Sequence, residues 1–521
     1  MSDVENKPGA GRIEGGIDAI VIGADAEGLT AAAYLGRAGY NTILLEAGVD
    51  IGGAVCAREL SPGQTYVDGE HLISILDPAV IADLDLYRHG VSYAARCLDT
   101  AYFFEDGETL QLGGDLQMAA AAFDDEETGP AFQKFITDVF EAAAFCRPGF
   151  EAGPASDIEK AMRAAPRALA ARLNFFSLAP AQEVLDAYLP DGALKTALLC
   201  EAGFRSAAAP HEPFSFMTLV RRWAGEIAGL QGACAYPQGG AIAVVTALRR
   251  AAQAAKVDIR AATGVASILI EQDHAAGVVL EGGGQIRAPI VVAAGAARRV
   301  FMEMIGAATI DIEFQRAITA ARPQLASGHL HLALKGVARD EKTRGHMNRR
   351  LVYAPPREAL RRAFADARAG RVPSDLMIEA VFPDALDEET GGEKMQLLSA
   401  IAHPLPFDEA PDAARRDEIE KTILANIEKF APDIEDRIKA RALRLASDIA
   451  TSTGAPAQDY AAPPSIIEQV ALARVASSAG YVGGLYFCGR EARIGAGLSC
   501  AAGRMAAKAA LFEAKRGGRA A

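Results

Sequence analysis

The sequence has no long apolar run and no excess of positive charge, and these two absences exclude whole classes of protein. Within its 521 residues, no stretch approaches the roughly 18 consecutive apolar residues that a membrane-spanning helix needs. Acidic residues outnumber basic ones by 67 to 53, which gives a net charge of −14. This charge argues against a nucleic-acid partner and against an anionic membrane surface as the main attraction.

Cysteine is sparse, and no two of the seven cysteines stand at C-x-x-C spacing or closer. This spacing argues against a disulfide reductase, which needs two neighbouring thiols, and it favours reduced thiols in a cytoplasmic protein. Clusters with zinc-ligand spacing are also missing. His329 and His331 share one face of a predicted strand but have no third ligand, so we predict a structural role for them and no metal site.

The length of the chain indicates two or more domains, because single cores rarely grow past roughly 250–300 residues. Residues 1–16 are polar and glycine-rich, without the apolar segment of a signal peptide, and we expect a disordered leader there. Elements of a nucleotide-binding fold occur in three separate segments. We therefore predict an α/β protein with a Rossmann-like FAD-binding domain and an interrupted α+β substrate-binding domain. The first domain would comprise residues 17–95, 235–305 and 440–521, and the second residues 96–234 and 306–439.

The strongest motif is a βαβ unit near the N-terminus. Asp18–Ile22 and Thr42–Leu45 have the pattern of short buried strands, with a helix of small residues between them. After the first strand, Gly23-Ala24-Asp25-Ala26-Glu27-Gly28 occupies the place of the G-x-G-x-x-G turn that sets a pyrophosphate on a helix N-terminus. Glu46 ends the second strand, where such a unit has the acid that binds a ribose hydroxyl.

Asp25 departs from this pattern, because the middle glycine of the turn normally lets the backbone approach the phosphates closely. An aspartate adds bulk and a negative charge, and a pyrophosphate about 4–6 Å away would repel it unless it were paired or protonated. Its side chain could also cap the helix by accepting hydrogen bonds from the amides that a phosphate would use. Two alternatives remain: a weakened dinucleotide site, or a helix end that is satisfied without any cofactor.

Two further glycine-rich stretches fit the same kind of ligand. Gly52-Gly53 follows the acid and would let the backbone pass under a dinucleotide, although a bare turn explains it equally well. The run from Cys488 to Gly497 leads into a C-terminal helix and carries Arg490 and Arg493. These arginines could bind a phosphate or the edge of a reduced flavin, or they could pair with a local carboxylate such as Asp25.

Several separated motifs make the chain resemble the superfamily of flavin-dependent amine oxidases and phytoene desaturases. The branch it most resembles contains bacterial phytoene-desaturase-like proteins and the eukaryotic pyridine nucleotide-disulphide oxidoreductase domain-containing protein. The resemblance covers about residues 17–515. In order, it is carried by Ile51–Ala54, Tyr87–Gly90, Phe104–Gly107, Gly232–Gly240, Gly264–Ile268, Gly484–Gly489 and Ala501–Arg504.

The resemblance implies an FAD-dependent oxidoreductase, in which hydride transfer at the flavin changes C–C or C–N bonds. Its desaturase branch acts on long apolar polyenes, so an apolar substrate of the isoprenoid or carotenoid kind is expected. The residues implied to bind FAD are Gly23, Ala24, Asp25, Gly28 and Glu46 at its ADP half, Gly52 and Gly53 beneath it, Val265 at the adenine, and Gly489, Arg490, Gly497 and Leu498 along the flavin.

The departures from the family fall on these same motifs. The family's second turn glycine is Asp25, and its glycine before the last helix is Cys500. The sequence therefore leaves an alternative function open, a cofactor-free binding protein that retains the fold, with Asp25 blocking the pyrophosphate site. Rab GDP-dissociation inhibitors are a precedent for this fold without flavin.

The substrate side is less informative. We leave the catalytic residues unassigned, with Arg205 and His211 as weak candidates for polar groups facing the flavin and solvent exposure expected for both. The apolar stretch around Leu169–Leu178 is expected to be a core helix. The alternative, a surface helix dipping into a membrane, would allow peripheral membrane contact. An apolar cavity or the core could hold Phe204, Phe214, Phe216, Met217 and Trp223.

Overall fold

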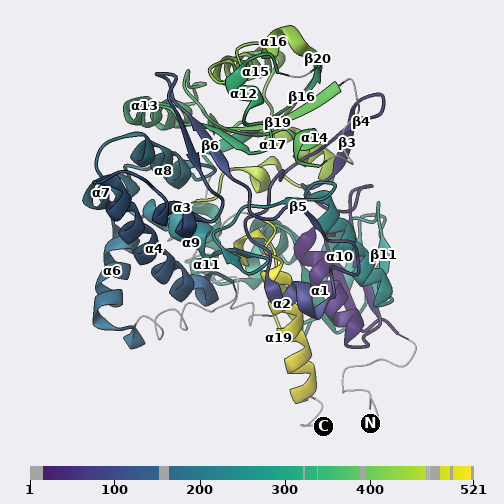
Figure 1. The fold of residues 1–521 in the computed structure, drawn as a ribbon. Helices are drawn as coiled ribbons and strands as arrows, with labels where there is room; N and C mark the ends of the chain where they lie inside the picture. Colours follow the sequence, from purple (N-terminus) through teal and green to yellow (C-terminus); the bar gives the residue numbers. More distant parts are fainter. Residues whose placement is uncertain are drawn as a thin grey trace.

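The structure is a computed structural model that describes residues 16–151, 163–320, 323–336, 338–387, 395–464, 466, 469, 482–492 and 497–517. The expected leader lies outside these residues except for Gly16, and Arg493 lies outside them as well. Two large sheets organise the described chain, a five-stranded sheet in the lower half of Figure 1 and a seven-stranded sheet in the upper half.

The five-stranded sheet is parallel and has the order β11-β2-β1-β15-β21. Its three central strands are buried throughout and are continuous apolar runs, as expected for a parallel sheet that is covered on both faces. The strands come from all three segments assigned to the Rossmann-like domain. They are β1 (Ala19–Ile22), β2 (Thr42–Leu45), β11 (Asp258–Arg260), β15 (Ile290–Ala293) and β21 (Leu485–Phe487).

One face of this sheet is covered by α1 (Ala26–Arg37), which packs against α10 (Ile242–Ala254) and α19 (Ala501–Gly517). Small residues allow close contact, since a Cβ added at Gly503 would lie 2.0 Å from the carbonyl oxygen of Glu27. The other face packs against a meander of β12 (Val265–Glu271), β13 (His274–Leu280) and β14 (Gln285–Arg287).

One predicted strand is divided in the structure. The apolar residues over residues 285–293 predict one continuous strand, but β14 ends at Arg287 and β15 begins at Ile290. Pro289 lies between them and has no amide hydrogen to donate to a neighbouring strand, so the chain leaves the meander there and enters the parallel sheet.

The seven-stranded sheet has the order β20-β16-β19-β18-β17-β6-β7. The predicted boundary at residue 440 is wrong, because it cuts β20, which pairs with β16 along its length. All of β20 therefore belongs to the seven-stranded sheet. The strands are β6 (Thr100–Phe103), β7 (Thr109–Leu112), β16 (Leu325–Lys335), β17 (Arg350–Tyr353), β18 (Met377–Val381), β19 (Met395–Pro406) and β20 (Ile438–Arg444).

Helices cover this sheet on both sides. One face packs against α15 (Ala413–Glu428) and α16 (Ile434–Arg437), at the top of Figure 1. The other side carries α13 (Arg357–Arg368) and a helix-rich block. The block comprises α3 (Leu116–Ala121), α4 (Thr128–Glu151), α6 (Arg167–Leu178), α7 (Ala181–Tyr188), α8 (Ala193–Gly203) and α9 (Phe216–Ala224).

The helix-rich block answers two questions that the sequence left open. Leu169, Leu173 and Phe176 of α6 are buried in its core, while Leu178 at the end of the helix is 52% exposed, so α6 packs on the core through one face. Phe216 and Trp223 are buried in the same core and stand 6.1 and 6.0 Å from the Phe135 ring between centroids, so they do not line a cavity. Of the helices that the structure describes, none is long and apolar enough to cross a membrane.

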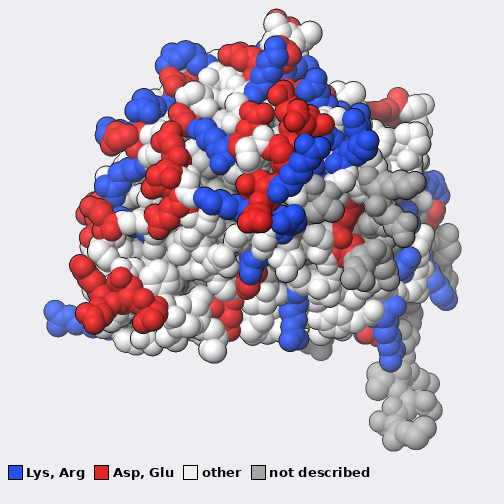
Figure 2. Space-filling view, turned by 45° about the horizontal axis from the view of Figure 1, so that its top comes forward, with Lys and Arg blue, Asp and Glu red and all other residues white. Residues whose placement is uncertain are grey.

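On the face shown in Figure 2, acidic and basic side chains lie side by side over the upper part, and a group of acidic side chains lies at the lower left.

Candidate functional site

A cavity of about 290 Å³ lies at the carboxyl ends of the parallel strands, and we call it the first cavity. It is lined by residues that follow β1, β2, β15 and β21, which is the edge where open α/β sheets bind ligands. Ten of the twelve residues that the sequence suggested for cofactor binding line it. They are Gly23, Ala24, Asp25, Glu46, Gly52, Gly53, Val265, Arg490, Gly497 and Leu498.

The other two residues, Gly28 and Gly489, lie behind the wall of the first cavity and do not line it. A Cβ added at Gly28 would lie 2.0 Å from the carbonyl oxygen of Gly23, and one at Gly489 would lie 1.7 Å from that of Gly295. Both positions therefore need glycine so that backbone segments can pack closely behind the lining residues.

Asp25 is the N-cap of α1. Its backbone is extended, with φ −74° and ψ −178°, and its Oδ1 accepts a hydrogen bond of 2.9 Å from the Gly28 amide. The side chain lies against the glycine pair, since a Cβ added at Gly53 would come within 2.8 Å of the Asp25 Cβ. The helix cap that the sequence allowed is therefore present in the structure.

Glu27 is a site residue that sequence reasoning missed. Glu27 is 3% exposed, and its side chain reaches the N-terminus of α19. There, Oε2 accepts a hydrogen bond of 2.8 Å from the Gly503 amide, and Oε1 accepts one of 3.3 Å from the Ser499 hydroxyl. Together with Asp25, it places a carboxylate of the chain at both helix N-termini beside the first cavity. These are the positions at which helices bind anions. The only sign of this role in the sequence is that Glu27 is an acidic residue inside the turn motif.

Glu46 is held by the turn that it faces. Its Oε2 accepts a hydrogen bond of 2.7 Å from the Ala24 amide, and its Oε1 accepts one of 2.8 Å from the Gly48 amide. Burial raises the pKa of Glu46, the two amide bonds oppose that shift, and the neighbouring Asp25 adds to it. Asp25, Glu27 and Glu46 thus form an acidic group around the first turn.

Two arginines, Arg299 and Arg490, also line the first cavity. Arg490 donates to the carbonyl oxygens of Asp459 at 2.6 Å and Ala461 at 2.9 Å, and Arg299 donates to that of Gly454 at 3.1 Å. The other arginine that the sequence placed near Asp25, Arg493, lies outside the described residues. Burial and then Glu491 raise the pKa of Asp459, which also lines the first cavity, to about 7.

A smaller second cavity of about 110 Å³ adjoins the first and shares four lining residues with it: Glu70, Arg205, Pro463 and Gly497. Arg205 and Glu70 form a two-bonded ion pair, with Nη1–Oε2 at 2.6 Å and Nη2–Oε1 at 2.8 Å. The expected solvent exposure of Arg205 is therefore wrong, because this ion pair holds it in the wall between the cavities. The other weak candidate, His211, lines neither cavity.

A buried charge cluster forms one wall of the second cavity. Arg350 lies between two carboxylates, donating to Glu201 Oε1 and to Glu379 Oε2 at 2.5 Å each. Burial alone would raise the pKa of Glu379, but Arg350 and His71 hold it well below its usual range. These residues come from distant parts of the sequence and belong to no motif, so they could not be predicted.

Metal binding has no support in the part of the chain that the structure describes. No three or more His, Cys, Asp or Glu side chains there gather in an arrangement that could hold an ion. His329 lines the first cavity, while His331 faces Ser399 and Asp68.

Known proteins support the same architecture. Residues 21–80 match the family described as an NAD(P)-binding Rossmann-like domain. The pyridine nucleotide-disulfide oxidoreductase domain-containing protein 2 of Rattus norvegicus is 27% identical over 536 residues, or 94% of this chain and 92% of that protein. Phytoene desaturase of Fusarium fujikuroi is 25% identical over 283 residues, or 52% of this chain and 48% of the desaturase. A putrescine oxidase variant has a TM-score of 0.63 at 16% identity, covering 96% of this chain and 99% of that one.

These matches confirm the predicted resemblance to the superfamily of FAD-dependent oxidoreductases that contains the phytoene desaturases and the amine oxidases. They also confirm the predicted fold class, a Rossmann-like α/β domain joined to a second domain. The likeness to putrescine oxidase concerns the fold alone.

Proposed function

We propose that this protein is an FAD-dependent oxidoreductase whose cofactor lies in the first cavity. The observation that carries the proposal is the convergence of ten motif residues, from five separate stretches of the sequence, on one cavity at the carboxyl ends of a parallel sheet. Chance packing would not gather the turn, the acid, the glycine pair and the C-terminal motif at one place.

The lining residues fit FAD in their layout. Gly23 has φ +93°, and a Cβ there would lie 2.7 Å from the carbonyl oxygen of Ala294, so the turn requires glycine at this position. In the proposed arrangement, Glu46 would bind the ribose, Val265 would contact the adenine, and Arg490 and Leu498 would lie along the flavin. Bound FAD would supply hydride transfer, and the protein's own residues would bind and orient the reactants beside it.

The second cavity is the proposed substrate site, because it shares a wall with the first. The partial match to phytoene desaturase favours an apolar substrate, and Leu72, Ile75, Phe204 and Ile466 provide apolar lining. Glu201, Glu379 and Arg222 also line this cavity, and they already pair with one another and with Arg350. We therefore propose a substrate with an apolar body and a polar group that lies beside this charge cluster.

The absorbance spectrum of the purified protein tests the cofactor proposal. We expect a yellow protein with the flavin bands, which bleach when dithionite is added. A protein that stays colourless after incubation with excess FAD and gel filtration would overturn the proposal.

A second candidate is a cofactor-free binding protein with the same fold. It is favoured by one specific observation, the presence of the Asp25 and Glu27 carboxylates at both helix N-termini beside the first cavity. The amides that a pyrophosphate would use are partly satisfied by these side chains. This candidate predicts a colourless protein whose melting temperature does not rise with added FAD.

A further inference from the structure

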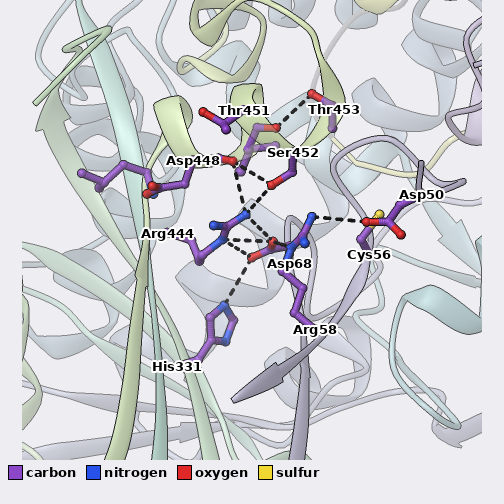
Figure 3. Close-up of polar contacts among 12 residues, drawn as sticks. Asp50, Cys56, Arg58, Asp68, His331, Arg444, Asp448, Thr451, Ser452 and Thr453 are labelled. Atoms are coloured by element: carbon purple, nitrogen blue, oxygen red, sulfur yellow. Dashed lines mark hydrogen bonds and ion pairs between the residues drawn. The ribbon is translucent and has the colours of Figure 1, made fainter. Parts of the chain in front are cut away.

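Asp68 is a buried carboxylate between two arginines, and no sequence motif pointed to it. Its side chain is 2% exposed. Arg58 donates through Nε to Oδ2 at 2.6 Å, and Arg444 approaches from the other side with Nε at 3.1 Å and Nη2 at 3.0 Å from Oδ2 (Figure 3). Burial lowers the pKa of the neighbouring His331 to about 3, so this imidazole is neutral and the two guanidinium groups provide the countercharge. We call Asp68, Arg58 and Arg444 the clamp.

The clamp joins elements that are far apart in the sequence. Arg58 belongs to β3 (Ala57–Ser61), and its Nη2 lies 3.8 Å from Asp50, just before the glycine pair of the first cavity. Arg444 is the last residue of β20 in the seven-stranded sheet. Its Nη2 also donates to the Ser452 hydroxyl at 2.9 Å, on α17 (Ala446–Thr453), and the same helix lines the first cavity with Ile449 and Thr453 (Figure 3).

The clamp also fixes the loop that separates the two cavities. Gly69 follows Asp68 with φ +79°, and a Cβ there would lie 2.7 Å from the carbonyl oxygen of Ala54, so only glycine lets this loop pack so closely against the residue after the glycine pair. Glu70 comes next and forms the ion pair with Arg205. Arg205 itself has φ +57°, a conformation that non-glycine residues rarely adopt and that often marks functional sites.

From this geometry we infer that Asp68 is a positioning residue, which sets the spacing of the walls of the first cavity and holds the Glu70–Arg205 pair at its junction with the second. Three segments that line the first cavity are linked to the Asp68 carboxylate. The loop of residues 68–70 contains it, the loop of residues 50–54 is linked to it through Arg58, and α17 is linked to it through Arg444. Removing the carboxylate leaves two guanidinium groups facing each other, and their repulsion drives these walls apart.

Hydrogen exchange of the cofactor-free protein tests the clamp directly. In Asp68→Asn, we expect exchange to become about tenfold faster in peptides covering residues 50–56, 68–72 and 446–454 together, and to stay unchanged elsewhere. If Asp68→Asn does not fold, Arg58→Gln is the milder variant, because Arg58 is 24% exposed and is only one of the two donors. Faster exchange throughout the protein, or in one of the three segments alone, would overturn the inference.

Asp138→Asn is the matched control. Asp138 is a carboxylate of α4 that pairs with Lys134 at 2.6 Å and Arg172 at 2.9 Å, and it lines neither cavity. Its loss should lower the melting temperature without accelerating exchange in the three segments. The same acceleration in this variant would mean that general destabilisation explains the result, and the positioning role would be rejected.

Cofactor affinity gives a second readout, which rests on the proposed function. We expect the Kd for FAD, followed by quenching of flavin fluorescence, to rise about tenfold in Asp68→Asn and to stay unchanged in Asp138→Asn. An unchanged Kd in Asp68→Asn would contradict the positioning role. If the wild-type protein binds no FAD, the proposed function fails, while the exchange experiment still decides whether the clamp exists.

Discussion

Replacing Asp25 separates the charge of this residue from its role as a helix cap. Asn keeps a side-chain oxygen that can accept from the Gly28 amide, whereas Gly removes both the charge and the cap. Two unit charges about 5 Å apart repel by roughly 3 kcal/mol at an effective dielectric constant of about 20. Counter-ions and the two arginines that line the first cavity reduce this value, so we expect the variants to gain about 1.4 kcal/mol of binding free energy, which is about tenfold in affinity.

The assay is the Kd for FAD measured by fluorescence quenching, together with the free energy of unfolding in urea. Asp25→Asn and Asp25→Gly should both bind FAD about tenfold more tightly than the wild type. The stability of Asp25→Gly should fall by only a few tenths of a kcal/mol, because an extended N-cap tolerates glycine well. Asp412→Asn is the control. Asp412 caps α15 with the same geometry, because its Oδ1 accepts a hydrogen bond of 2.8 Å from the Arg415 backbone amide, and it lines neither cavity.

The FAD affinities of the two variants together distinguish the charge of Asp25 from the bulk of its side chain. Unchanged or weaker affinity in both variants would refute charge repulsion at the turn. Tighter binding in Asp25→Gly alone would mean that the bulk of the side chain beside Gly53, and not its charge, limits the approach of the cofactor.

Three further changes probe other parts of the molecule. The pKa of Asp459 is raised to about 7, so the folded state holds an extra proton between about pH 4 and 7, and its contribution to stability is lost as pH rises through that window. Asp459→Asn should flatten this part of the stability profile in urea titrations, and an unaltered profile would contradict the assignment. Arg350→Gln should cost about 3–5 kcal/mol of unfolding free energy, because it leaves two buried carboxylates with too few partners; a loss below about 1 kcal/mol would show that the cluster relaxes. Cys500 has φ +62°, so Cys500→Gly should be more stable than Cys500→Ala by about 1 kcal/mol, the reverse of the usual order, and a higher melting temperature for the Ala variant would disprove the strain.

Much of the fold followed from local patterns. The β1–α1–β2 unit lies within a residue or two of its predicted position, because the period of apolar residues and the glycine turn act over short distances. The cavity-lining residues were found for the same reason, since motifs mark the ends of strands and parallel strands end at one edge of the sheet. The strand over residues 285–293 was wrong at a proline, and the division at residue 440 was wrong because strand pairing is not local.

The sequence by itself determined the kind of fold, the place of the candidate site and the anomaly at Asp25, because each depends on residues that are neighbours along the chain. Only the tertiary structure decided what surrounds that site. The contact of Glu27 with α19 joins residues 476 positions apart, and the Asp68–Arg444 contact joins residues 376 positions apart. Such pairings depend on the path of the whole chain, since an isolated acidic or basic residue has the same local pattern whether it faces solvent, a helix end or a buried partner.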